Sequence, residues 1–466
     1  MDNLATKVTS SKSVRIIECK IIGSNGQVRD LKDPIIFDNI QIYESLYSPV
    51  VSGTIQLQEG VNLQAIVNAH GNEYLYISFS RPGEEGVESK YQRTFRIYSS
   101  SMKKPINDSL IQTYILHFCS EEMLFSNQQT ISRTFKGASH AEHVRNILLQ
   151  DLKTNPKRVV RIEQTAGNDK HVLTKYKPFE AIEYFASQSY SKNETPFVFF
   201  ENRDGYNFVS LETLLNKQTP IEPALTYSTA KFTYEPSVAV GKNSNQIKQF
   251  EFTQAFDTLY GTKEGVYANR LYTLDLIRQR YATYDYSIVS AKSKNSLVAG
   301  NFPINDAQNR SGKALYEEYN AAPNYWLTNL GLNDTEYLAA VNTRRDTSIH
   351  KDPYRITNSD VELTLVQRKM QLEFLENTKL WCIVSGNPNY SVGFTIKVDI
   401  PAFIPNAVGS IATDAYYSGE YLITNLRHSI TPEDIETVLT LCRNSINTKM
   451  DEAAIGSSNY KTARAF

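Results

Sequence analysis

Two histidines lie at a spacing that could hold a metal ion. His140 and His143 are three residues apart at the start of a predicted helix, where Ser139 and Glu142 form a capping box. This spacing can bring two imidazoles to one zinc ion. No cysteine or acidic pair with a matching spacing completes a ligand set. The pattern therefore predicts the solvated start of a helix, with no metal site and no cofactor.

A serine nucleophile is a second candidate, because Ser429 directly follows His428. No Gly-x-Ser-x-Gly elbow surrounds any serine, so we interpret His428 as a structural strand residue and expect no catalytic residue here. Phosphate-binding loops are also absent from the sequence: it contains neither Gly-x-x-x-x-Gly-Lys-Ser/Thr nor Gly-x-Gly-x-x-Gly.

Pairs of carboxylates could serve glycoside hydrolysis if their carboxyl groups lay about 5 to 10 Å apart. The candidates are Glu121 with Glu122, and Glu201 with Asp204. Sequence alone does not give these distances, and we interpret both pairs as surface charge. A basic cluster could contact nucleic acid, but it lacks interleaved aromatic residues and equally suits a solvated helix end; it consists of Lys153, Lys157, Arg158 and Arg161.

Composition limits the class of protein. The chain has 466 residues, enough for two to four domains, and 41% of them are hydrophobic. Its 49 basic residues balance 50 acidic ones, so bulk charge implies no strong binding to nucleic acid or a membrane surface. No apolar run is long enough to span a bilayer, and the start of the chain lacks an apolar signal core. We interpret four widely spaced cysteines as reduced core residues: Cys19, Cys119, Cys382 and Cys442.

The segment from residue 359 to 445 predicts a helix followed by an antiparallel meander. Ser359 and Glu362 suit a helix start, and apolar residues on two stripes of the helix indicate that it is buried. Alternating runs then predict four strands, separated by turn-forming residues. These runs are Leu380 to Val384, Phe394 to Ile400, Gly419 to Ile430 and Thr437 to Cys442.

Earlier parts of the chain show two kinds of pattern. Alternation from Val14 to Ser120 predicts a first set of strands, in which Pro49 marks a kink and Gly53 would permit a bulge or a barrel corner. Helical periodicity then appears after Ser139 and again after Pro178, followed by a hairpin with its turn at Gly205.

Three blocks of this sequence resemble the central hub proteins of contractile-tailed phages. The first block runs from Phe37 to Phe79 and has the pattern "iyEsLysPvvsGtI…GnEyl.I.f". The second lies between Pro178 and Glu212, and the third is the meander, from Tyr416 to Ser445. This family of late-control or baseplate hub proteins shares its fold with the N-terminal part of the type VI secretion spike protein. The resemblance covers about two thirds of the chain and skips residues 291–358.

The resemblance and the strand patterns together predict a mainly β (α+β) protein with two tube-type antiparallel β-barrels. Because both barrels show alternating strands of like length and order, we expect them to share a strand order. The expected domains are a first barrel at 10–129, a small α/β insert domain at 130–225, a second barrel at 226–290 plus 359–446, an insertion of unknown fold at 291–358 and a C-terminal tail at 447–466. We assigned three strands of residues 245–290 to the second barrel.

The function implied by the resemblance is that of a structural virion protein in the tail baseplate, made in the host cytoplasm and without enzymatic activity. Such hubs form a homotrimer that joins the sixfold tail tube protein to the central spike protein. Other baseplate and tape-measure proteins are possible partners, genomic DNA would pass through the lumen without specific binding, and no membrane is involved. Two alternatives stay open: a wall-degrading glycosidase on a β scaffold, and a carbohydrate-binding or receptor-binding β protein.

The polar tail after the last strand cannot bury enough apolar surface to offset the ordering of about twenty residues. We expect it to be mobile in the free protein and to lead towards the spike. Tyr460 and Phe466 are its candidate interface residues, because aromatic side chains give the most contact area per ordered residue.

Overall fold

The computed structural model describes residues 15–31, 36–67, 69–82, 88–106, 110–166, 171–191, 195–216, 220–227, 245–275, 280–291, 312–328, 361–402, 413–414, 416–432 and 435–445. Ser359 and the candidate tail residues Tyr460 and Phe466 lie outside these ranges. Among the described residues, no helix combines the length and the apolar character that a membrane crossing needs.

A 13-stranded sheet forms the main part of the molecule. Its strands are β1 (Arg15–Ile22), β2 (Val28–Asp30), β3 (Ile36–Ser45), β4 (Ser52–Glu59), β5 (Tyr74–Pro82), β6 (Glu88–Pro105), β7 (Gln112–Cys119), β13 (Ile221–Thr226), β14 (Ile247–Gln254), β18 (Thr378–Ser385), β19 (Thr395–Asp399), β20 (Gly419–Ile430) and β21 (Ile435–Arg443). Buried and partly exposed residues alternate along β4 and β18, as expected for strands with one face on a core. The prediction of a mainly β protein is confirmed.

The sheet consists of two halves with the same strand order. The first half is β1 with β3 to β7, paired in the order β3-β4-β7-β6-β5-β1, and the small strand β2 extends its edge. The second half is β13, β14 and β18 to β21, paired in the order β14-β18-β21-β20-β19-β13. Numbered along the chain, both orders are 2-3-6-5-4-1. The halves differ at their last pair, since β1 and β5 are antiparallel whereas β13 and β19 are parallel.

Some irregularities of the ladders recur at the same places in both halves, although β6 has a further one between Ser101 and Lys104 and β14 has one between Phe252 and Gln254. β6 skips Tyr98 where it pairs with β7, and β20 skips Thr424 where it pairs with β21. In each half the skipped residue follows two regular pairs, and the first of these pairs contains a cysteine. The cysteine pairs are Arg96 with Cys119 in the first half and Leu422 with Cys442 in the second. β3 and β14 likewise each have a bulge near their start. A shared order with shared bulges indicates two copies of one structural unit.

The two halves form one continuous sheet and not two separate closed barrels. β20 pairs with β3 in antiparallel sense, from Asn425 opposite Ser45 to Ile430 opposite Ile40. Within the described residues no strand ladder closes either half into a barrel. In the second half a single isolated bridge joins Thr226 to Gln246. Alternation along a strand predicted the strands correctly, but it does not distinguish a closed barrel from an open sheet.

Gly53 does not mark a bulge, in contrast to the expectation from the sequence. It pairs in regular register with Ile42 on one side and Phe118 on the other. A Cβ atom at this position would lie 2.2 Å from the Gln41 carbonyl oxygen and 2.3 Å from the Phe118 ring. The glycine is therefore needed for close approach of a neighbouring strand and an aromatic ring.

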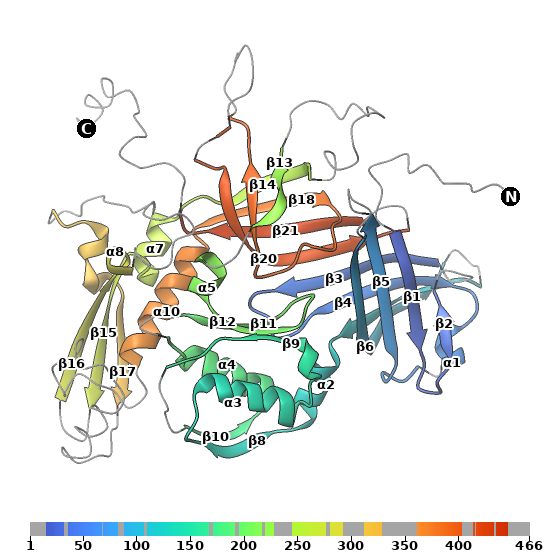
Figure 1. Ribbon diagram of the computed structural model, residues 1–466, viewed down its shortest axis with the longest axis horizontal. Helices are drawn as coiled ribbons and strands as arrows, with labels where there is room; N and C mark the ends of the chain where they lie inside the picture. Colours follow the sequence, from blue (N-terminus) through green and yellow to red (C-terminus); the bar gives the residue numbers. More distant parts are fainter. Residues whose placement is uncertain are drawn as a thin grey trace, which may run out of the picture.

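The α/β module (residues 121–216) packs below the sheet in Figure 1. Its elements are α2 (Glu121–Gln128), β8 (Ile131–Phe135), α3 (His140–Asn146), a π-helical turn (Ile147–Asp151), a 3₁₀ turn (Pro156–Arg158), β9 (Val159–Ile162), β10 (His171–Tyr176), α4 (Pro178–Gln188), β11 (Phe197–Glu201), β12 (Tyr206–Ser210) and α5 (Leu211–Asn216). Strands β11, β12 and β9 form one small sheet, and β10 and β8 form another. The predicted helices and the predicted hairpin are all present.

The prediction for strands β15 (Ala268–Asp275) and β16 (Arg280–Ser287) is wrong. We assigned them to the second barrel, but they form a separate sheet with β17 (Pro323–Thr328), which lies within the predicted insertion. β13, assigned to the insert domain, pairs instead with β19 of the main sheet. Figure 1 shows the separate sheet at the far end of the molecule from the blue strands. The residue limits of the domains stay a prediction.

The remaining helices lie beside these sheets. They are α1 (Leu63–Ile66), α7 (Thr258–Glu264), α8 (Ile288–Ala291), α10 (Val361–Leu375) and the 3₁₀ turns Leu315–Glu317 and Tyr319–Ala321. The predicted long helix is α10, and it buries Val366, Met370 and Phe374. Lys369 is exposed, but Arg368 donates to the Phe197 carbonyl of β11, and Leu375 lies in a different core cluster from Met370 and Phe374, so the helix packs against more than one neighbour.

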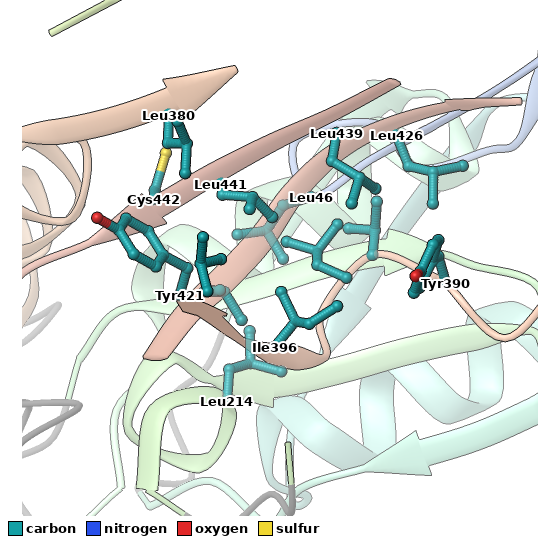
Figure 2. Packing of buried hydrophobic residues seen from close by; sticks show 14 of the residues in the cluster. Leu46, Leu214, Leu380, Tyr390, Ile396, Tyr421, Leu426, Leu439, Leu441 and Cys442 are labelled. Carbon is teal, nitrogen blue, oxygen red and sulfur yellow. The ribbon is translucent and has the colours of Figure 1, made fainter. Parts of the chain in front are cut away.

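Two hydrophobic cores each contain side chains from both halves of the main sheet. The core of the second half includes Leu46 from the end of β3 and Leu214 from α5, beside Leu439 and Leu441 of β21. Figure 2 shows these side chains converging from different elements. The core of the first half in turn includes Ile430 from β20. All four cysteines are buried and none forms a disulfide, as predicted.

Candidate functional site

The histidines of the α/β module are buried, and the predicted solvated helix start is wrong. His140 Nε2 lies 2.9 Å from His171 Nε2, and His140 Nδ1 lies 3.2 Å from Ser189 Oγ. Burial and the neighbouring histidines lower the pKa of His140 to about 3, which keeps the ring neutral. The helix cap itself is as predicted, with the Glu142 amide donating to Ser139 Oγ at 3.4 Å.

Nothing in the described residues groups three or more metal-binding side chains closely enough to hold an ion. The aromatic ring of Phe185 packs against His140, His143 and His171. These histidines therefore form part of the packing of the module.

His428 is a core residue of the main sheet, as interpreted from the sequence. Its side chain is fully buried, its Nδ1 lies 2.9 Å from Thr437 Oγ1, and its ring meets Phe79 and Tyr91 edge-on. Burial, with a smaller contribution from Arg203, lowers the pKa of His428 to about 3. Ser429 Oγ donates weakly to Asn39 at 3.4 Å and not to the histidine, so the two residues do not form a nucleophile and base pair.

Glu201 is the centre of a buried polar cluster, which we call the ionic joint. Arg93 and Arg158 both donate to its Oε1, while Ser120 Oγ and the Val51 amide donate to its Oε2 at 2.6 and 2.7 Å. The joint also includes Glu122, whose carboxylate accepts from Arg158 at 3.0 Å. The prediction that Glu122 and Glu201 are surface charges is therefore wrong.

Both oxygens of the Glu201 carboxylate accept hydrogen bonds from donors in other parts of the chain. Its side chain is 0% exposed, so it cannot reach a polysaccharide substrate. Burial opposes the charge on Arg93, but the Glu201 carboxylate outweighs burial and raises the pKa of the guanidinium. Arg93 therefore stays charged, and the joint fastens the α/β module to the first half of the sheet.

The same hairpin fastens the module to the second half. Arg203 donates to the Pro388 carbonyl at 2.7 Å, and Asn202 Nδ2 donates to the Val392 carbonyl at 3.1 Å. Both acceptors lie in the loop between β18 and β19. Residues 201 to 203 of one hairpin thus hold three parts of the molecule: the module, the first half and the second half. Asp204, by contrast, is exposed, and among the described residues its carboxylate forms an ion pair only with Arg203.

Glu44 lies where β3 meets β20, opposite Leu426. Its Oε2 accepts from Ser391 Oγ at 2.8 Å and from the Val392 amide at 3.1 Å, while its Oε1 is buried and has no hydrogen-bond partner among the described residues. Burial raises the pKa of Glu44 to about 7, against the opposing effects of these hydrogen bonds and of Arg93 and Arg203. A titratable carboxyl therefore lies inside the contact between the two halves.

Sequence reasoning missed Arg93 and Glu44, although one signal was present. Tyr91, Arg93, Phe95 and Ile97 are alternate residues of β6 and all point to the core. A charged residue at an inward position of an alternating strand indicates a buried partner of opposite charge.

The predicted basic cluster is also divided, because Arg158 belongs to the ionic joint whereas Lys153, Lys157 and Arg161 are exposed.

A comparison with curated proteins found one similar protein. The chain is 23% identical over 412 residues to the Probable baseplate hub protein gp334 of Vibrio phage KVP40, which covers 87% of this chain and 89% of that protein. The chain is therefore similar to a baseplate hub protein of a phage tail along most of its length. No protein-family model matches the chain. The predicted resemblance, and the role of a structural baseplate protein, are confirmed.

A solved structure of a phage tail protein shares the fold of this chain at very low identity. The 43 kDa tail protein of prophage MuSo2 from Shewanella oneidensis aligns over 92% of this chain and 98% of its own, at 9% identity and a TM-score of 0.50. A tail protein from Neisseria meningitidis MC58 aligns over 92% of this chain and 97% of its own, at 9% identity and a TM-score of 0.48. The fold is therefore one already seen in a phage tail protein.

Proposed function

We propose that three copies of this hub protein assemble into a ring that joins the sixfold tail tube to the central spike. The observation that supports it is the duplicated strand order, since each chain carries two copies of one structural unit. Three chains would present six such units, which matches a sixfold tube, while the ring itself keeps the threefold symmetry that suits a trimeric spike. In this assembly each half would act as one tube-type barrel of the ring.

The ionic joint suits a structural role of this kind. It holds the α/β module and both halves together through Glu201, Arg93 and Arg203. We propose that the chain has no enzymatic activity, and that genomic DNA passes through the lumen of the ring without specific binding. A net charge of -1 is consistent with that role.

Light scattering of the purified chain tests the ring. We expect a particle of three times the chain mass of 52.9 kDa, stable on dilution to micromolar concentration. Co-sedimentation with assembled tail tube should then depend on the trimer. A chain that stays monomeric at every concentration, or that forms a closed hexamer, would contradict the proposal.

We also propose that the C-terminal tail contacts the spike, with Tyr460 and Phe466 as anchors. Deletion of residues 450–466 should weaken capture of the spike protein while leaving the trimer and tube binding intact. The control is Tyr460→Ala with Phe466→Ala in the full-length chain, which should show much of the same loss. If spike capture is unchanged and tube binding fails instead, the tail points to the tube side.

A further inference from the structure

A cavity of about 350 Å³ lies where the α/β module meets the second half of the main sheet. Phe200 of β11, Asn207 of β12 and Arg161 of β9 lie side by side on one face of the small sheet, and all three line the cavity. Leu214 of α5 and Phe394, just before β19, line it as well. The cavity therefore has the size and the mainly apolar lining of a binding site.

Arg161 brings an unpaired positive charge to this cavity. It is exposed and forms no ion pair within the described residues, and the same holds for Lys157, just before β9. Arg158 lies between them but differs, because Glu122 and Glu201 hold it in the ionic joint. No described strand pairs with the outer edge of β9. An extended segment that carries a carboxylate close to a large apolar side chain would match these features.

The main sheet brings the end of the chain close to the cavity. Gly393 and Phe394, which both line the cavity, hydrogen-bond to Ile423 of β20. On its other edge Ile423 pairs with Leu441 of β21. The wall of the cavity and β21 are therefore two strand spacings apart, which is about 10 Å. From Leu441 the chain continues to Ser445, four residues and about 13 Å further along.

The C-terminal tail has a segment of matching chemistry within reach. Met450 is five residues beyond Ser445, and an extended chain of that length spans up to about 17 Å, enough to reach the cavity. Asp451 and Glu452 are the only acidic residues of the sequence after Ser445. Because successive side chains of an extended segment point to opposite sides, Met450 and Glu452 share one side. The unbranched side chain of Met450 suits an irregular apolar cavity.

We propose that residues 450–455 bind in this cavity of the same chain. The Met450 side chain enters the cavity, and the Glu452 carboxylate accepts hydrogen bonds from the Arg161 guanidinium. The tail buries too little apolar surface to order by itself, and the cavity supplies the surface that it lacks. The contact lies within one chain, so it does not depend on the proposed ring. It fixes the point from which residues 456–466, with both candidate spike anchors, extend.

Hydrogen exchange of the full-length chain, followed by mass spectrometry, tests the contact. After correction for intrinsic rates, the amides of residues 450–455 should exchange at least about fivefold more slowly than those of residues 457–463. Glu452→Lys and Arg161→Glu should each abolish this protection, and the double variant should restore most of it. Asp451→Lys changes the neighbouring carboxylate, on the other side of the segment, and is the matched control that should keep the protection.

A cross-link tests the position of the tail without depending on the strength of the contact. Val160 lines the rim of the cavity, so Val160→Cys with Ala453→Cys, treated with a short bis-maleimide, should give a link within one chain. Val172 is 72% exposed on β10, in a different sheet of the module. Val172→Cys with Ala453→Cys is the control and should give no link. The four native cysteines are buried and should react slowly.

The outcomes decide what occupies the cavity. Covalent dimers from a mixture of chains that carry only one of the two cysteines would assign the cavity to the tail of a second copy, and would overturn the proposal. Protection that is absent from the natural protein, or that persists in Arg161→Glu, would overturn it as well. A monomeric chain that shows both the protection and the internal link would support the tail contact even if the ring does not form.

Discussion

Replacing Glu201 with alanine should be among the most destabilising single substitutions in this hub protein. The change leaves the buried Arg93 without its carboxylate and Arg158 with only Glu122, and it removes the acceptor of Ser120 and of the Val51 amide. Removing one partner of a buried ion pair costs about 3 to 5 kcal/mol of unfolding free energy. Urea unfolding followed by circular dichroism measures this loss.

Asp204→Ala is the matched control, because it removes a carboxylate three residues away in the same hairpin. Asp204 is exposed and forms its one ion pair of the described structure with Arg203, so we expect a loss of no more than about 1 kcal/mol. We further expect the Glu201 variant to unfold in two steps, since the joint fastens the α/β module to the first half of the sheet. Similar losses for the two variants would show that the joint does not hold the parts together.

Strands were predictable from the sequence because their pattern is local. The run from Gly419 to Ile430 was predicted with the bounds that β20 has in the structure. Alternation also located β3, β4, β18 and β21 to within a few residues. Pairing partners were less predictable, because a period of two shows that one face is buried but not against which sheet. The misassignment of β15 and β16 has this cause.

The buried polar groups were not predictable for a related reason. Glu201 precedes the polar run Asn-Arg-Asp-Gly, which is typical of a surface turn, while its partner Arg93 is 108 residues away along the chain. His140 was correctly placed after its helix cap, but its burial depends on His171, in a different element. Local patterns therefore located the elements, and contacts between distant elements decided which polar groups are buried.

Acidification should destabilise the Glu44→Gln variant much more than the natural protein. His140 and His428 both have their pKa lowered to about 3 by burial. Because the unfolded chain binds protons more readily at these sites, their contribution to stability is complete above about pH 6.5 and is lost as the pH falls towards 3. When the pH is lowered from 7 to 5, the two histidines together lower the unfolding free energy by about 4 kcal/mol.

Glu44 acts in the opposite direction over the same pH range. Its pKa is raised to about 7 in the folded state, so the folded chain binds a proton more readily than the unfolded one between about pH 4.5 and 7. Its contribution is therefore greatest below pH 4.5 and falls as the pH rises to 7. When the pH is lowered from 7 to 5, protonation of Glu44 raises the unfolding free energy by about 2 to 3 kcal/mol. This gain offsets much of the loss that the two histidines cause.

Glutamine at position 44 cannot take up that proton, so the offset disappears. We expect unfolding free energy to fall by about 2 to 3 kcal/mol more in Glu44→Gln than in the natural protein when the pH is lowered from 7 to 5. Urea unfolding at pH 7, 6 and 5 measures the difference, with the fluorescence of Trp381 in β18 as the reporter. Glu420→Gln, a partly exposed carboxyl of the same sheet, is the control. Parallel pH profiles for the natural protein and Glu44→Gln would mean that Glu44 is ionised at the contact between the halves, and that the contact tolerates a buried negative charge at neutral pH.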